Sequence, residues 1–207
     1  MSFSKKIERW TGLFLILVII VFDGACAAHV RNEESKGLNV ICFGDSLTEG
    51  IGASAGGDFP SLLSQKLGRQ VVNAGRHGET TRDALKRIKQ DVLEKSPKLV
   101  ILEFGGNDFL KRIPQQETFD NTDKMVEMIQ KQGSMVALAT VGIGLFRDEY
   151  YAGFKKIARE RRTIFIPDIM KGIMSEPELK SDQIHPNDAG YKIIAERIYK
   201  AIQPWVK

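Results

Sequence analysis

The sequence predicts a three-layer α/β/α sandwich with a central parallel sheet of about five strands. The chain has 207 residues, 43% of them hydrophobic and 27% charged, which suits a single globular domain. Short apolar runs alternate with amphipathic stretches, and this order indicates parallel strands joined by helical crossovers. The runs are apolar on both faces, as expected for strands that helices cover on both sides.

Five short apolar runs account for the strands. The first, residues 40–43 (VICF), ends at a glycine and predicts a buried strand. Runs of the same kind predict the other four strands at residues 70–73, 99–104, 135–139 and 163–166.

Amphipathic stretches predict the helices between these strands. In residues 80–94, apolar side chains recur with the 3.6-residue spacing of one helix face. Pro60 stands near the first turn of a helix over residues 59–67, where proline is favoured. Asn187 is a suitable N-cap for a final helix that runs to residue 202. The two remaining helices are expected at residues 117–132 and 148–161.

The first 27 residues predict an export signal that is separate from the fold. Basic side chains come first, followed by apolar residues 12–22 and then by small residues. The apolar run is shorter than the ~20 residues of a membrane-spanning helix, although an uncleaved anchor is an alternative. Cleavage after Ala27 and lipid attachment to Cys26 both fit the small residues.

The residues after this signal predict a tethered, exported domain. Residues 28–37 are polar and are expected to form a tether, and residues 38–207 form the folded domain. This organisation predicts a periplasmic or cell-envelope location, with a membrane tether through the N-terminus as one option.

Composition excludes several classes of protein. The two cysteines and three histidines are too few for a Cys-rich zinc or iron–sulfur site or a multi-histidine metal centre. The formal net charge is only +4, and the densest basic run, residues 155–162, suits a solvated helix face. We therefore expect no metal, no cofactor and no nucleic-acid partner, while the oligomeric state is left open.

Polar segments stand where the predicted strands end. Parallel sheets bind ligands beyond the carboxyl ends of their strands, so these segments should share one rim. Each segment alone fits an ordinary turn or helix cap, but together they supply a serine, a histidine, a carboxylate, an amide and loop N–H groups. That set suffices for acyl transfer through a tetrahedral intermediate. The segments are residues 44–50, 73–80, 105–108 and 182–187.

The last of these segments contains a candidate base. Asp182 and His185 are three residues apart on a predicted turn, so the carboxylate can accept a hydrogen bond from one ring nitrogen. The other ring nitrogen is then available to take a proton from Ser46. His77 is a rival base with only Glu79 as a nearby carboxylate.

The four segments resemble the motifs of the SGNH (GDSL) hydrolase family. GDSL, NAGRHGET, GGND and DQIHPN occur in this order, and the likeness is strongest to the bacterial exported acyl-thioesterase, lysophospholipase and arylesterase branch. The resemblance implies that Ser46 is the nucleophile, His185 the base and Asp182 its partner. It also implies an oxyanion hole made by the Ser46 N–H, the Gly78 N–H and the Asn107 amide.

One position departs from the family pattern. His77 stands immediately before Gly78, where serine is frequent in the family. The donor glycine is present. The resemblance does not extend to the hydrogen bonding of its loop or to a preference for the same acyl chains.

Apolar segments are expected to flank the cleft and to favour an acyl chain or an aryl group. The sequence therefore predicts hydrolysis of lipid-like or aryl carboxylic esters or thioesters. A carbohydrate O-deacetylase of the same family is an alternative. A non-catalytic, flavodoxin-like module that binds phosphate with residues 44–50 is another, although it leaves Asp182 and His185 without a role. The candidate substrate-binding residues are Phe109, Leu110, Ile143, Leu145 and Phe146.

Overall fold

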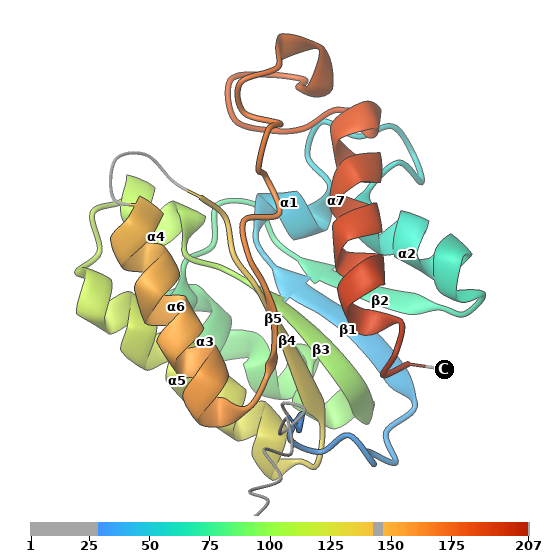
Figure 1. Ribbon diagram of the computed structural model, residues 1–207, viewed down its shortest axis with the longest axis vertical. Coiled ribbons are helices and arrows are strands. Elements are labelled where there is room, and N and C mark those ends of the chain that lie inside the picture. Colours follow the sequence, from blue (N-terminus) through green and yellow to red (C-terminus); the bar gives the residue numbers. More distant parts are fainter. Residues whose placement is uncertain (1–28, 143–146, 207) are drawn as a thin grey trace, which may run out of the picture.

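Five parallel strands form the centre of the fold, in the order β2-β1-β3-β4-β5 (Figure 1). The structure is a computed structural model that describes residues 29–142 and 147–206. Each strand arises from one of the predicted apolar runs. The strands are β1 (Asn39–Gly44), β2 (Val71–Gly75), β3 (Pro97–Glu103), β4 (Met135–Ala139) and β5 (Ile164–Ile166).

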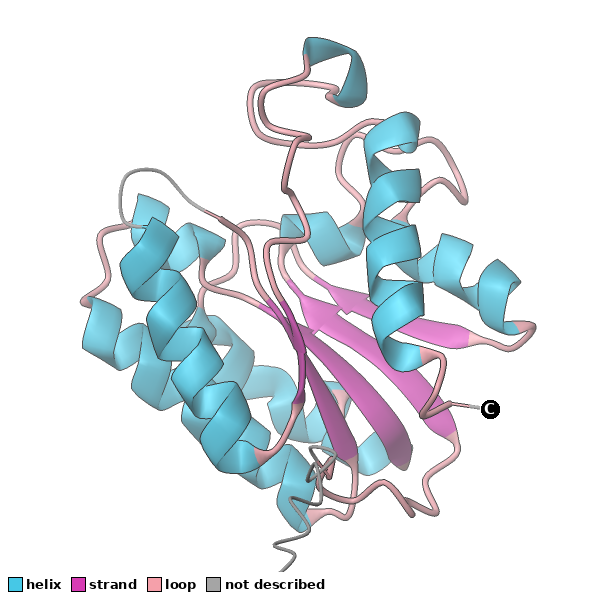
Figure 2. Cartoon of the chain, in the orientation of Figure 1, coloured by secondary structure: helices cyan, strands magenta, loops and turns pink. Residues whose placement is uncertain are grey.

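Helices cover both faces of this sheet, which confirms the predicted three-layer sandwich (Figure 2). Helices α2 (Phe59–Leu67) and α7 (Asp188–Ile202) pack against each other on one face. The opposite face carries the other three long helices, which are α3 (Thr81–Asp91), α5 (Gln115–Lys131) and α6 (Arg147–Arg161).

Residues of β1 show why its sequence is apolar throughout. Val40 and Cys42 belong to the core on the α2 and α7 side, whereas Ile41 and Phe43 belong to the core on the other side. All four side chains are fully buried. A strand between two helical layers has no face left for polar side chains, so the alternating pattern of a half-exposed strand is absent from it.

Short helical elements were missing from the sequence prediction. They are α1 (Ser46–Glu49), α4 (Gly106–Leu110) and the 3₁₀ turns Leu93–Lys95 and Pro177–Leu179. None is long enough to display a helical period. The helix predicted over 80–94 ends at Asp91 because Val92 leaves the helical conformation, with a φ of −128°, before the first 3₁₀ turn.

The segment predicted as a tether contacts the domain along part of its length. Val30 is buried in the core, and Asn32 Nδ2 donates to the carbonyls of Gln130 and Ser134 at 2.8 and 2.9 Å. The predicted signal over residues 1–27, including Cys26, lies outside the described residues. Among the residues that are described, no helix is long and apolar enough to cross a bilayer.

The N-terminus of α3 allows a test of stability against pH. Asp83 closes a capping box with Thr80, and hydrogen bonds from Lys86 and Thr80 lower the Asp83 pKa to about 2. A carboxyl whose pKa is lowered by folding stabilises the protein above its unfolded pKa of about 3.9, and this contribution is lost as the pH falls through about 2. We expect Asp83→Asn to lower the melting temperature at pH 5, with the difference from wild type vanishing between pH 4 and 2. An equal difference at pH 5 and pH 2 would contradict this origin.

Candidate active site

Ser46 begins helix α1 directly beyond the end of β1. Asp45 caps this helix, because its Oδ1 accepts a hydrogen bond from the Leu47 N–H at 3.0 Å. Gly44 is required before it, since a Cβ there would lie 2.0 Å from Thr48 Oγ1 and 2.7 Å from the Glu103 carbonyl oxygen. The tight strand-to-helix junction thus places the largely buried Ser46 hydroxyl at the rim of the sheet.

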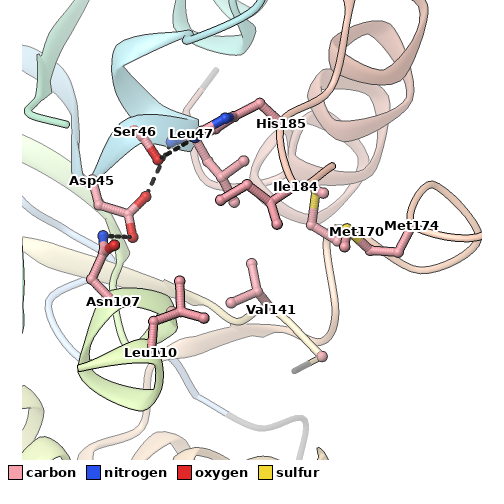
Figure 3. A pocket seen from close by; sticks show the side chains of 12 residues that line it. Asp45, Ser46, Leu47, Asn107, Leu110, Val141, Met170, Met174, Ile184 and His185 are labelled. Carbon is pink, nitrogen blue, oxygen red and sulfur yellow. Dashed lines mark hydrogen bonds between the residues drawn. The ribbon is translucent and has the colours of Figure 1, made fainter. Parts of the chain in front are cut away.

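Residues far apart in the sequence meet at this hydroxyl. His185 Nε2 lies 3.0 Å from Ser46 Oγ, and His185 Nδ1 lies 2.7 Å from Asp182 Oδ2 (Figure 3 shows the serine–histidine contact). The His185 backbone N–H also donates to Asp182 Oδ1 at 2.7 Å. The histidine is buried, whereas the Asp182 side chain is half exposed. The structure therefore brings the three predicted residues into one hydrogen-bonded chain.

The charge of Asp182 fixes the orientation of the histidine ring. The hydrogen bond from the His185 ring, followed by those from the His185 and Ile184 N–H groups, lowers the Asp182 pKa to about 2. The carboxylate is therefore ionised at neutral pH and favours the tautomer in which Nδ1 donates to it. In that tautomer Nε2 accepts the hydrogen of the Ser46 hydroxyl, which is the geometry of a serine activated by a general base.

Asn107 approaches the serine from helix α4. Its Nδ2 donates to Asp45 Oδ2 at 3.0 Å and to the Glu79 carbonyl at 2.9 Å, so the amide is held on two sides. Burial is the main cause that raises the Asp45 pKa, to about 6, against the opposing effect of the Leu47 N–H. The Asn107 side chain lines the same pocket as Ser46.

Gly78 lies in the loop after β2, immediately after His77. Its φ of 73° favours glycine, and its carbonyl accepts from Lys111 Nζ at 2.6 Å. The preceding residue, His77, donates its backbone N–H to Glu49, and its ring centroid lies 6.0 Å from that of His185. The structure thus places the predicted donor loop at the rim and puts His77 beside the histidine of the chain.

Asp108 joins two of the rim segments. It is fully buried, and its Oδ2 accepts from the Thr81 N–H at 3.0 Å while its Oδ1 accepts from the Thr118 hydroxyl at 3.3 Å. These contacts tie the start of α3 to the segment that carries Asn107. The sequence prediction gave Asp108 no role, and only its place beside Asn107 could have indicated one.

An apolar pocket of about 150 Å³ opens beside Ser46 and His185 (Figure 3). Leu110 lines it, as predicted. Phe109 is not among the residues that line it, and its ring packs edge-on against Tyr150 with centroids 6.0 Å apart. The candidates Ile143, Leu145 and Phe146 lie outside the described residues. The remaining apolar lining comes from Leu47, Val141, Met170, Met174 and Ile184.

All five of these apolar residues are absent from the predicted substrate-binding residues, and three of them lie in one segment. Met170, Met174 and Ile184 belong to the long segment between β5 and α7, which folds back over the rim. They are separated along the sequence and show no period. Only the position of that segment relative to the rim brings them to the pocket.

A parallel α/β/α sandwich with serine, histidine and aspartate in hydrogen-bond contact at one rim has the architecture of a hydrolase. Residues 42–193 match the GDSL-like Lipase/Acylhydrolase family, and the chain belongs to this family. It is therefore an ester hydrolase, and the resemblance read from the four motifs is confirmed.

Relatives of known type agree with this membership. The chain is 28% identical to Thioesterase 1/protease 1/lysophospholipase L1 of Escherichia coli strain K12, covering 100% of this chain and 98% of the relative. It is 27% identical to the Arylesterase of Vibrio mimicus, covering 87% and 94%. The crystal structure of TesA shares the fold with a TM-score of 0.75 at 24% identity, covering 81% and 99%.

Proposed function

We propose that this protein is a serine esterase that hydrolyses carboxylic esters or thioesters with apolar acyl or aryl groups. The observation that carries the proposal is the 3.0 Å contact between Ser46 Oγ and His185 Nε2 at the edge of an apolar pocket. The names of the relatives, a thioesterase/lysophospholipase and an arylesterase, support the same class of substrate.

The reaction follows from these contacts. His185 Nε2 takes the hydroxyl proton as Ser46 Oγ attacks the carbonyl carbon, and Asp182 stabilises the imidazolium that forms. His185 then returns the proton to the leaving alkoxide or thiolate, which departs and leaves an acyl group on Ser46. Water, deprotonated by the same nitrogen, attacks this acyl-enzyme and regenerates the serine.

Asn107 is proposed as a donor to the oxyanion, together with the N–H groups of Ser46 and Gly78. Its amide hydrogens are directed at Asp45 and Glu79 in the free protein, so an oxyanion must share one of them. Loss of one such donor costs roughly 10²- to 10³-fold in kcat. We expect this loss from Asn107→Ala in an ester assay. Asn39→Ala, which removes a donor to the Lys95 carbonyl at the other end of the sheet, serves as the matched control. A silent Asn107→Ala would remove this residue from the mechanism.

The size of the pocket suggests which acyl groups fit. Apolar cavities of about 150 Å³ hold a molecule such as benzene. A short acyl or aryl group therefore fits inside, and a longer chain extends over the rim. The pocket mouth is apolar there, because Leu110, Met174 and Ile184 are 58%, 40% and 46% exposed.

A chain-length series of p-nitrophenyl and acyl-thiol esters tests the substrate class. We expect kcat/KM to rise by up to about fourfold for each methylene buried, and then to level off once the pocket is full. Val141→Phe should fill the pocket, lowering kcat/KM at least tenfold for hexanoyl esters and less than threefold for acetyl esters. The proposed substrate class would be contradicted if kcat/KM did not depend on acyl chain length, or if Val141→Phe left that dependence unchanged. A preference for acetylated xylan over all acyl and aryl esters would contradict it too.

We also propose that the protein is exported to the periplasm or cell envelope. Support comes from the basic, apolar and small residues that begin the chain, together with the alignment of the whole chain to the Escherichia coli relative. The mass of the mature N-terminus distinguishes cleavage after Ala27 from a lipid on Cys26.

A further inference from the structure

Glu103 is a buried carboxyl group that the proposed mechanism does not use. It ends β3 and pairs in register with Gly44, the residue before Asp45. The side chain is fully buried, and its Oε2 accepts from the Thr48 hydroxyl at 3.0 Å. In the described part of the chain, Oε1 has no hydrogen-bond donor. A buried carboxylate oxygen without a donor is costly, so this atom needs an explanation.

Asp45 is the acidic neighbour of Glu103, and its backbone N–H and its carboxyl group both interact with the Glu103 side chain. It is also buried, and the two carboxyl groups are close enough to hydrogen-bond to each other. Two buried carboxyl groups that hydrogen-bond to each other resist carrying two negative charges, so the pair favours keeping one proton. Burial first, and then the charge of Asp45, raise the Glu103 pKa well above its usual range, whereas the Asp45 pKa reaches only about 6. Of the two carboxyl groups, Glu103 is therefore the one that favours the proton.

We propose that Glu103 is a positioning residue, a neutral acid whose hydroxyl donates to Asp45 and so orients Asn107. The other contacts of Asp45 lead to the site, because it accepts from the Leu47 N–H of helix α1 and from Asn107 Nδ2, each at 3.0 Å. A donor beneath Asp45 holds both of those contacts in place. The inference rests on the proposed function, since it takes Asn107 as an oxyanion donor.

The alternative is that Glu103 only stabilises the fold. An apolar side chain at this position leaves the Thr48 hydroxyl and the Asp45 carboxylate without a partner, and buried groups left unpaired lower stability. The effect of Glu103 on catalysis therefore has to be measured separately from its effect on folding. Two substitutions make that separation possible.

Glu103→Leu removes the donor, and Glu103→Gln keeps it. The amide of the glutamine can donate from Nε2 to Asp45 and accept from Thr48 through its oxygen. We expect Glu103→Leu to lower kcat at least tenfold with KM within about twofold, because a hydrogen bond to a charged group is lost at a distance from the substrate. Glu103→Gln should retain kcat within about threefold. The melting temperature of Glu103→Leu is expected to fall, because Thr48 and Asp45 each lose a buried partner, so kcat is measured at a temperature where circular dichroism shows the variant to be folded.

A double-mutant cycle with Asn107→Ala tests whether the effect passes through the amide. We expect Glu103→Leu to add little in the Asn107→Ala background. Additive losses, full activity of Glu103→Leu, or a Glu103→Gln variant as impaired as the leucine variant would each overturn the inference. A silent Asn107→Ala would refute the oxyanion role of Asn107 in the proposed function. An active Asn107-dependent enzyme in which Glu103→Leu has no effect would refute only the positioning role of Glu103.

Infrared spectroscopy supplies a test that does not depend on the leucine variant folding. A protonated carboxylic acid has its own carbonyl band, separate from the carboxylate bands. At pH 7 we expect this band in the wild-type protein and expect Glu103→Gln to lack it. Absence of the band from the wild-type protein, or its persistence in Glu103→Gln, would overturn the inference.

Discussion

Replacement of Ser46 by alanine is expected to lower kcat by about 10⁴- to 10⁶-fold with p-nitrophenyl esters, the loss typical of removing a serine nucleophile. The hydroxyl is the group that would form the acyl-enzyme, and His185 Nε2 lies 3.0 Å from it. With the oxygen gone, the histidine can only activate water. The variant should fold, because alanine can occupy the first position of α1 and the cap supplied by Asp45 is unaffected.

Ser35→Ala is a matched control for this substitution. Its Oγ accepts from the Gly37 N–H, in the segment before β1 and so at the opposite end of that strand from Ser46. Activity of this control should equal that of the wild type. A serine-directed phosphonate should add one mass increment to the wild-type protein and none to Ser46→Ala. Retention of more than about 1% of kcat by Ser46→Ala would exclude the acyl-enzyme route through this residue.

The fold could be predicted because its signals are local. A run such as residues 40–43 is apolar at every position since each side chain is buried on one face of β1 or the other. The glycine that ends the run is also explained by local sterics, because Gly44 lies against Thr48 and Glu103. Helix ends are less predictable. At Val92 the backbone leaves the helix, although the side chains around this residue still fit the helical period.

The rim residues were predictable for a related reason. Parallel topology brings the carboxyl ends of the strands together, so the sequence predicts that Ser46 and Asn107 lie near each other. In the structure both residues line the same pocket.

Other features of the site depend on long-range packing. Asp45 and Glu103 are far apart along the chain, and nothing in either segment indicates that the two carboxyl groups meet beneath the serine. Met170 and Met174 likewise reach the pocket only through the course of a long connection. Phe109 is not among the residues that line this pocket, and its ring packs against Tyr150 instead. An apolar residue at such a sequence position can therefore line the pocket or pack into the core, and long-range packing decides which.

His185→Ala is expected to lower kcat by about 10⁴- to 10⁶-fold, as for the serine, because nucleophile and base act as a unit. His77 provides a demanding control, since its ring lies only 6.0 Å from that of His185. The two differ in their partners, because Asp182 contacts His185 Nδ1 at 2.7 Å, whereas His77 is exposed and contacts Glu49 only through its backbone. His77→Ala should therefore retain kcat within about threefold.

The pH dependence of the His77 variant decides between the two rings. A base that is already protonated cannot accept the serine proton, so activity must fall at low pH. The Asp182 pKa of about 2 keeps that carboxylate ionised throughout the fall, so loss of its charge is not the cause. We expect His77→Ala to show the same low-pH fall in kcat/KM as the wild type. If that fall disappears in His77→Ala, or if His185→Ala retains it at near-normal rates, then His77 is the base and the contact between Ser46 and His185 is not the catalytic one.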